Sequence, residues 1–350
     1  MDSIHITTPH RSYPIHFGAL APKLQFKGKV LVVSNSRVSG LYLDFLLPKI
    51  SAPEICICII EDGEQYKTLE SVQRILETAF VHRLDRKSTM IALGGGVVGD
   101  IVGFAAGIFM RGIDFVQIPT TLLAQVDASI GGKTGINNAF GKNLIGLFHQ
   151  PASVHIDPFF LQTLPAREFA AGVAEIVKMA VTFDAPFFEW LWEHHLSLEA
   201  QDSLLTALRC AISIKQRVVC QDEKEQGLRA ALNYGHTFGH AIEKESGYGQ
   251  YLHGEAVSMG IVMVNALACK LGCLTSDEAE RICALLQSYN LPTRYKIANK
   301  QQFYHSLFLD KKTANNKIKF ILPDSIGNVL FYDKFTHEEI MNVLEQFCDS

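Results

Sequence analysis

The hydrophobic pattern of the chain changes near residue 160. From Lys29 to about Pro158, short β-branched runs alternate with helical or glycine-rich stretches. This alternation predicts a largely parallel α/β sheet. From about Leu164 onward, apolar residues recur at helical spacing, and no Pro/Ser-rich linker separates the two halves. We therefore expect two domains with a wide shared interface: an α/β domain with a mostly parallel sheet over 1–160, and a mostly α-helical domain over 161–350.

The composition restricts the partners of the chain. Of its 350 residues, 48% are hydrophobic, which is enough for packed cores. A net charge of -4 offers no overall positive field for nucleic acid or anionic lipid. The most apolar stretches are shorter than the roughly 20 residues of a membrane-spanning helix. We expect a soluble protein with no nucleic-acid or membrane partner.

The N-terminus and the cysteines indicate the compartment. The first residues lack a basic start followed by an apolar core, so no secretory signal is visible. The eight cysteines include no Cys-x-x-Cys pair and are interpreted as reduced thiols, mostly in the core. Cys269 and Cys273, one helical turn apart, are interpreted as packing residues rather than metal ligands. These features predict a cytoplasmic protein.

A glycine-rich turn follows the apolar run 90–93. Its spacing, Gly94-x-Gly96-x-x-Gly99, matches the dinucleotide fingerprint, but the acidic residue expected about 20 positions later is missing. Glycines at the start of a helix let backbone amides approach a phosphate. Asp62–Lys67 and Thr120–Thr121 also follow predicted strands, so they are expected at the same sheet edge, where such sheets bind ligands.

A second glycine-rich segment, Gly131–Thr134, carries Lys133. A nucleotide-binding P-loop would require glycine at position 127, which is Asp127, and a nucleoside-triphosphate hydrolase is therefore excluded. We expect a lysine-rich loop, continued by Lys142, that suits a phosphate or carboxylate.

Polar residues in the second half recur at helical steps. If the segment is helical throughout, Arg229, Asn233, His236 and His240 share one narrow stripe. A further helix begins at His253, and an earlier predicted helix carries Glu175. Two imidazoles and one carboxylate are typical ligands of an open catalytic zinc site.

For this predicted metal site we choose Glu175, His236 and His253, although spacing alone does not decide between His240 and His253. The other ten histidines have no comparable neighbours and are interpreted as ordinary.

Eight strings together resemble the 3-dehydroquinate synthase family, in order over about residues 55–325. They are Gly94–Asp100, Met110–Gly112, Gln117–Asp127, Gly131–Thr134, Gly141–Gly146, Ala174–Lys178, Leu232–Glu243 and His253–Ala256. The resemblance implies an N-terminal NAD-binding α/β domain, a helical C-terminal domain, a divalent metal (zinc or cobalt) in the cleft, and a homodimer. It also selects Glu175, His236 and His253 as the metal ligands.

The same resemblance implies which residues bind the other ligands. Those implied for NAD are Asp62, Gly63, Glu64, Gln65, Tyr66, Lys67, Gly96, Val97, Val98, Gly99, Asp100, Thr120, Thr121, Lys133, Lys142, Phe160, Leu161, Gln162 and Thr163. Those implied for substrate and catalysis are Arg111, Asp127, Lys133, Asn143, Lys178, Lys215, Arg229, Asn233, His240, and one or both of Lys311 and Lys312.

The implied reaction converts the anionic sugar phosphate 3-deoxy-D-arabino-heptulosonate 7-phosphate to 3-dehydroquinate in the shikimate pathway. It proceeds by transient oxidation with NAD, phosphate elimination, reduction and aldol closure. One alternative is a related sugar-phosphate cyclase, against which Asn143, Arg229, Asn233 and His240 favour a carboxylated substrate. Another is a metal-dependent glycerol or alcohol dehydrogenase, which would form net NADH.

Overall fold

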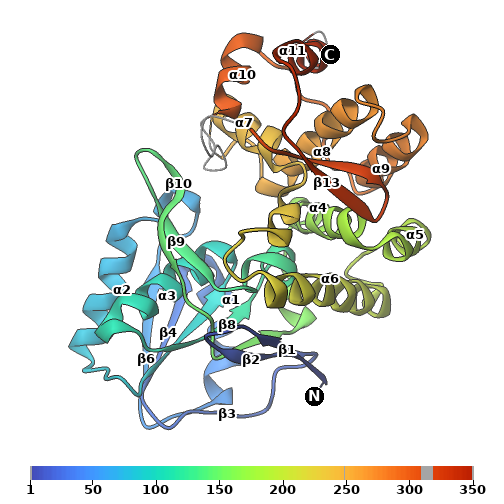
Figure 1. Ribbon diagram of the computed structural model, residues 1–350. Helices are drawn as coiled ribbons and strands as arrows, with labels where there is room; N and C mark the ends of the chain where they lie inside the picture. The colour runs from blue at the N-terminus through green and yellow to red at the C-terminus, as the bar shows by residue number, and fades with distance from the viewer. Residues whose placement is uncertain (1, 248, 309–317, 349–350) are drawn as a thin grey trace. The chain divides into compact units, whose positions relative to one another are not determined.

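The computed structural model describes residues 2–247, 249–308 and 318–348 (Figure 1). The chain divides into two compact units. The first comprises 1–165 together with 215–224, and the second comprises 166–214 and 225–350.

The first unit is built on a seven-stranded sheet in the order β1-β2-β11-β8-β7-β4-β6. Neighbouring strands are parallel except for β1, which is antiparallel to β2. The strands are β1 (Asp2–Thr7), β2 (Ser12–Phe17), β4 (Val30–Asn35), β6 (Ile55–Ile60), β7 (Thr89–Gly94), β8 (Asp114–Pro119) and β11 (Ser153–Ile156). The predicted α/β class with a mostly parallel sheet is confirmed.

Helices cover both faces of this sheet, which explains the uninterrupted apolar runs of its central strands. Leu31 and Val33 of β4 pack in one core with α2 (Leu69–Val81) and α3 (Gly96–Ile108). Val30 and Val32 point to the other face and pack in a second core with α1 (Ser36–Leu46). Every residue of β4 and β7 is buried.

The strand order places a topological switch point beside β4. The chain passes from β4 through α1 to β6 on one side, and then returns to β7 on the other side of β4. In open α/β sheets, ligands bind at the carboxyl ends of the strands next to such a reversal. The ends of β4, β6, β7 and β8 therefore define the edge at which a ligand is expected.

Smaller elements complete the first unit. Lys133 and Lys142 belong to a β-hairpin, not to the loop that the glycines predict. The elements are the hairpin β9 (Lys133–Asn138) and β10 (Gly141–Phe148), the pair β3 (Leu24–Gln25) and β5 (Ile50–Ser51), the 3-10 turns η1 (Leu47–Lys49), η2 (Glu64–Tyr66), η3 (Phe109–Arg111) and η5 (Pro158–Leu161), and the π-helical turn η4 (Ala124–Ala128).

The second unit is mostly helical, as expected, but also contains the hairpin β12–β13, which the sequence analysis does not predict. The elements are α4 (Ala166–Phe183), α5 (Ala185–Glu193), α6 (Gln201–Gln221), η6 (Leu228–Asn233), α7 (His236–Ser246), α8 (His253–Lys270), α9 (Ser276–Ser288), α10 (Lys300–Leu307), β12 (Phe320–Ser325), β13 (Asn328–Tyr332) and α11 (His337–Glu345). The last residues of α6, from Lys215, are grouped with the first unit.

All eight cysteines are free thiols, as predicted, but only Cys56 and Cys58 are buried. The expectation that most of them lie in the core is wrong, since the other six are partly exposed. Within the described residues, no helix is both long enough and apolar enough to cross a lipid bilayer.

Candidate functional site

Three helices of the second unit bring one carboxylate and two imidazoles together. Glu175 lies in α4, His236 is the first residue of α7, and His253 is the first residue of α8. Oε1 of Glu175 is 3.7 Å from Nε2 of His236 and 3.6 Å from Nε2 of His253. One ligand atom from each residue lies within 4.8 Å of the others, so the three can hold one metal ion.

The arrangement around Glu175 fits a cation. Its side chain is 1% exposed, and Oε1 has no hydrogen-bond partner in the described part of the chain. Its other oxygen forms an ion pair with Lys178, one turn along the same helix. Because an unsatisfied carboxylate oxygen is costly to bury, a divalent metal at this point would satisfy the donor set.

His236 is held with one nitrogen directed toward Glu175. Its Nδ1 lies 3.1 Å from the carbonyl oxygen of Tyr234, which favours the tautomer protonated at Nδ1, with Nε2 as the nitrogen that can bind a metal. Gly235, which caps α7, has φ +79°, a left-handed conformation that glycine adopts without strain. The condition of one continuous helix from Arg229 to His240 is not met, because a 3-10 turn ends at Asn233 and α7 begins at His236.

His253 has a carboxylate behind its ring. Nδ1 of His253 is 3.7 Å from Oε2 of Glu243, which is 4% exposed. Carboxylates in this position orient metal-binding histidines and raise their basicity. Spacing did not single out Glu243, although its place seven residues after His236 puts both on one face of α7.

The start of α8 is fixed by an ion pair. Arg167 binds both oxygens of Glu255, at 2.6 and 2.7 Å, and Glu255 accepts a hydrogen bond of 2.8 Å from the backbone of Leu252. The arginine holds the pKa of the Glu255 carboxyl below its usual range, although burial opposes this. Gly254 allows α8 to approach α4 closely, since a Cβ there would lie 2.0 Å from the carbonyl oxygen of Ala171.

Spacing alone made His240 as good a candidate ligand as His253, but His240 lies outside the group formed by Glu175, His236 and His253. It forms a second group of possible ligands with Glu243 and His253, and this group does not include Glu175. The ring of His240 is 5.6 Å from that of His236 and 6.1 Å from that of His253, centroid to centroid. His240 is thus beside the cluster of Glu175, His236 and His253.

Further predicted residues of the second unit include two deeply buried cations. Lys178 is 1% exposed and Arg229 is 2% exposed. Asn233 donates a hydrogen bond from its amide to Glu225, whose φ of +58° is unusual for a residue with a side chain. Lys311 and Lys312 lie outside the described residues.

In the first unit, the predicted ligand-binding segments meet at the carboxyl edge of the sheet. Asp62–Lys67 follows β6, and Gly94–Gly96 joins β7 to α3, whose first amides face this edge. Thr120 follows β8 and donates its backbone N–H to Gly94 at 2.9 Å. The hydroxyl oxygen of Thr120 is buried without a hydrogen-bond partner among the described residues. This cradle of amides and hydroxyl fits the phosphates of a dinucleotide.

One residue at this edge was missed by the sequence analysis. Asn35 ends β4 and donates from Nδ2 to Oδ1 of Asp62 at 2.6 Å, while its own Oδ1 accepts from Val38 and caps α1. Like Asp62, Asn35 is a polar residue at the carboxyl end of a strand, and this position is the sequence signal that could have identified it. Phe160–Thr163 lies nearby in its own turn, where the hydroxyl of Tyr42 contacts Phe160 and Thr163.

Lys67 connects residues predicted for two different ligands. Its ammonium is buried and donates to Oδ2 of Asp100 and to Oδ1 of Asn143, each at 2.5 Å. Burial raises the pKa of the Asp100 carboxyl, and the nearby Lys67 opposes this shift. Asn143 has φ +53°, so its backbone is held in a strained conformation.

Asn137, which the sequence analysis also missed, attaches the hairpin β9–β10 to the Asp62–Lys67 segment. Its amide donates to Oε1 of Glu64 at 2.8 Å, and its backbone N–H donates to the carbonyl of Lys67 at 2.8 Å. Lys133, at the start of the hairpin, is exposed, and Lys142 is partly buried.

Lys215, which is buried, pairs with the partly exposed Asp127 at the π-helical turn η4. The Lys215 ammonium is 5% exposed and donates to Oδ1 of Asp127 at 2.5 Å and to its carbonyl oxygen. Arg111, at the end of η3, is exposed and has φ +70°. Single π-helical turns and left-handed side-chain residues occur often at functional sites, although neither identifies a ligand.

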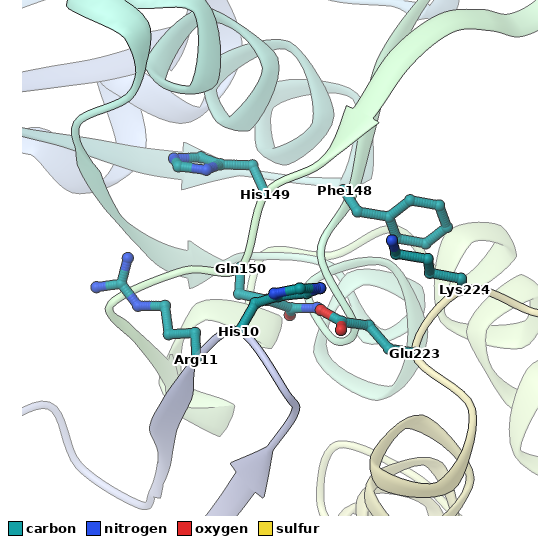
Figure 2. A pocket seen from close by; sticks show the side chains of 7 residues that line it. All are labelled: His10, Arg11, Phe148, His149, Gln150, Glu223 and Lys224. Carbon is teal, nitrogen blue, oxygen red and sulfur yellow. The ribbon is translucent and has the colours of Figure 1, made fainter.

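A pocket of about 480 Å³ lies elsewhere on the first unit (Figure 2). Arg11 pairs with Asp114 at 2.8 Å, and Gln150 donates to Glu223 at 2.8 Å. A ring nitrogen of His149 also lies 2.9 Å from the carbonyl oxygen of Ile113, so four of the seven lining residues have polar partners. None of the seven was predicted as a site residue. The lining residues are His10, Arg11, Phe148, His149, Gln150, Glu223 and Lys224.

Comparison with known proteins covers almost the whole chain. Residues 57–171 match the family model described as 3-dehydroquinate synthase N-terminal, and residues 172–313 match 3-dehydroquinate synthase C-terminal. The 3-dehydroquinate synthase of Wolinella succinogenes is 63% identical over 349 residues, which is 100% of both chains. That of Helicobacter hepaticus is 60% identical over 344 residues, or 98% of this chain and 97% of the relative.

A solved structure shares the fold and carries ligands. The 2-epi-5-epi-valiolone synthase of Streptomyces hygroscopicus, with NAD+ and Zn2+ bound, is 31% identical with a TM-score of 0.85. The match covers 93% of this chain and 92% of that protein.

Proposed function

The chain belongs to the 3-dehydroquinate synthase family, and we propose that it converts 3-deoxy-D-arabino-heptulosonate 7-phosphate to 3-dehydroquinate and phosphate. In this proposal it is a phosphate-eliminating carbon-oxygen lyase that uses NAD and a divalent metal, zinc or cobalt. The observation that most supports this proposal is the convergence of Glu175, His236 and His253 around a buried carboxylate oxygen, which lacks a hydrogen-bond partner in the described residues.

Glu175, His236 and His253 would hold the metal, and the carboxyl edge of the first unit would hold NAD. When bound, the metal supplies Lewis acidity toward substrate hydroxyls, and NAD supplies a reversible hydride acceptor. Tyr234 and Glu243 would fix the two imidazoles through the nitrogens that face away from Glu175. Thr120 and the first amides of α3 would bind the cofactor phosphates.

The substrate carries a carboxylate and a phosphate, and the chain provides buried cations of the appropriate charge. Lys178 and Arg229 are assigned to these anionic groups, with Asn233 and His240 positioned to orient the substrate. Fixed ammonium and guanidinium groups stabilise charge that develops as phosphate leaves, without the reorganisation that water would require. Lys133, Lys215, Asp127, Asn143 and Arg111 are assigned to the same substrate.

The relatives favour this substrate over that of another cyclase. The chain is 63% identical to a protein named 3-dehydroquinate synthase over its full length, and 31% identical to the valiolone synthase. No contact in the described residues favours a simple alcohol or glycerol substrate.

Phosphate release tests the proposal directly. Purified protein with zinc or cobalt and less than one equivalent of NAD should release phosphate over many turnovers, and absorbance should show no accumulating NADH. Glu175→Gln should abolish release, whereas Glu193→Gln, a change at an exposed carboxylate of α5, should not. Steady NADH accumulation would indicate a dehydrogenase, and absent phosphate release would contradict the proposed reaction.

The homodimer is also proposed, with Arg111 as the residue that reaches the partner. Light scattering of the purified chain should give twice the mass of 38.9 kDa. A monomer that is fully active would contradict this part of the proposal.

A further inference from the structure

Three different metal-binding side chains converge in the first unit, away from the residues assigned to NAD. Glu54 precedes β6, Cys56 is the second residue of β6, and His82 caps the end of α2. One ligand atom of each lies within 4.8 Å of the other two. From the sequence, the cysteines are expected to be mostly core thiols and His82 an ordinary histidine.

The cluster lies at the amino end of β6, whereas Asp62 follows its carboxyl end. We propose that Glu54, Cys56 and His82 form a second metal site, which binds zinc through one carboxylate oxygen, one thiolate and one imidazole nitrogen. This inference does not depend on the proposed reaction.

The separations between the ligand atoms fit one ion. Sγ of Cys56 is 3.5 Å from Oε1 of Glu54, and Nδ1 of His82 is 3.8 Å from the same oxygen. In a tetrahedral zinc site with Zn–S near 2.3 Å and Zn–N or Zn–O near 2.0–2.1 Å, ligand atoms are separated by roughly 3.3–3.6 Å. The two separations from Oε1 are close to this range, and Cys56 and His82 offer ligand atoms within 4.8 Å of each other, so the side chains need to close in to complete the site.

Lys29 holds the carboxylate in a suitable orientation. Its ammonium binds Oε2 of Glu54 at 2.7 Å and the carbonyl oxygen of His82 at 2.8 Å. Oε1 of Glu54 is thereby left facing the thiol and the imidazole. The last carbonyls of α2 add the partial negative charge of a helix C-terminus, which also favours a cation.

Zinc binding would exchange a proton for the ion. The S–H bond of Cys56 breaks, a Zn–S bond forms, and the proton leaves to solvent. Cys56 is 4% exposed, whereas the side chains of Glu54 and His82 are 44% and 43% exposed. The site would thus have one buried ligand and an open side, where water completes the coordination.

Cobalt distinguishes this site from the metal centre in the second unit. A thiolate bound to Co2+ produces a charge-transfer band in the near ultraviolet, and the centre around Glu175 contains no cysteine. The experiment uses the full-length His253→Ala protein, so that the centre around Glu175 binds little metal. Titration with Co2+ should produce the band, and zinc should remove it by displacement.

Matched variants in the same background locate the ligands. Cys56→Ser should abolish the band, whereas Cys58→Ser, two residues along the same strand, should keep it. Cys58 is equally buried, and its sulfur accepts a hydrogen bond from Thr78. His82→Gln should weaken cobalt binding at least tenfold, with circular dichroism confirming that each variant is folded.

These measurements decide whether Glu54, Cys56 and His82 bind a metal. Loss of the band in Cys56→Ser, together with a zinc-dependent rise in melting temperature that His82→Gln removes, supports it. A folded protein that takes up cobalt without a charge-transfer band contradicts it. A band that persists in Cys56→Ser, or disappears in Cys58→Ser, also overturns the proposal.

Discussion

The Nε2 atom of His253 lies 3.6 Å from Oε1 of Glu175, although 78 positions separate the two residues in the chain. This contact distinguishes His253 from His240, which groups with Glu243 instead. We expect His253→Ala to lose tightly bound metal, because one of the three proposed ligands is removed, and His240→Ala to retain it. Metal analysis after dialysis against a chelator measures both. Retention in His253→Ala and loss in His240→Ala would reassign the ligand.

Lys67→Met should weaken NAD binding. The change removes the ammonium that positions Asp100 and Asn143 at the carboxyl edge of the sheet. We expect NAD binding to lose the equivalent of one charge-assisted hydrogen bond, about 1.5–3 kcal/mol, so the dissociation constant should rise roughly 10- to 150-fold. Isothermal titration calorimetry with NAD gives the value. Lys87→Met, at an exposed lysine before β7, should bind as the unmodified chain does. Unchanged affinity in Lys67→Met would remove Lys67 from the cofactor site.

Gly254→Ala should disturb the metal centre without changing a ligand. Its Cβ would lie 2.0 Å from the carbonyl oxygen of Ala171, so α8 must move away from α4 and carry His253 with it. We expect a loss of about 1–3 kcal/mol in unfolding free energy, together with weaker metal binding.

The control for that change is Gly40→Ala in α1, where an added Cβ meets nothing within 4 Å. It should raise stability by about 0.4–1 kcal/mol. Urea denaturation compares the two variants, and equal effects would show that close packing at Gly254 is unimportant.

His155 predicts how stability depends on pH. Burial lowers the pKa of its imidazole to about 4, with a smaller contribution from the nearby His16. In the unfolded chain this imidazole binds a proton near pH 6.5, whereas in the folded chain it stays neutral down to about pH 4. The free energy of unfolding therefore falls as the pH drops from about 6.5 to about 4. The loss reaches up to about 3 kcal/mol.

Replacing this side chain should flatten that part of the profile. In His155→Gln, urea denaturation at a series of pH values should show a weaker fall, while His10→Gln, at an exposed histidine, should keep it. An identical fall in His155→Gln and in the unmodified chain would mean that other groups cause it.

The α/β architecture was predictable because buried parallel strands leave apolar runs that end in polar or glycine-rich turns. Leu31 and Val33 face one core and Val30 and Val32 the other, so the run has no alternation and resembles no amphipathic helix. The hairpin β9–β10 was not predictable in the same way. A Cβ on Gly146 would lie 2.2 Å from the carbonyl oxygen of Thr134, so its glycines serve close strand pairing, which in sequence resembles a loop.

The candidate site was predictable where motifs were local, and less so where contacts are distant. Steps of four, three and four suggested one helix over 229–240, but the left-handed Gly235 separates a 3-10 turn from α7. Spacing could not choose between His240 and His253, because the choice depends on α4, far away in the chain. The end of a buried strand is the sequence signal for Asn35. Asn137 acts through one side-chain amide with no surrounding motif, so only the folded chain reveals it.

The ion pair between Glu175 and Lys178 affects what happens to the protein when the metal is removed. A buried ligand that already has an ammonium beside it keeps a charge partner when the metal departs. Depletion by a chelator should therefore yield an inactive but folded reserve that reloads on contact with metal. Loss and recovery of the metal would then be reversible without unfolding of the chain.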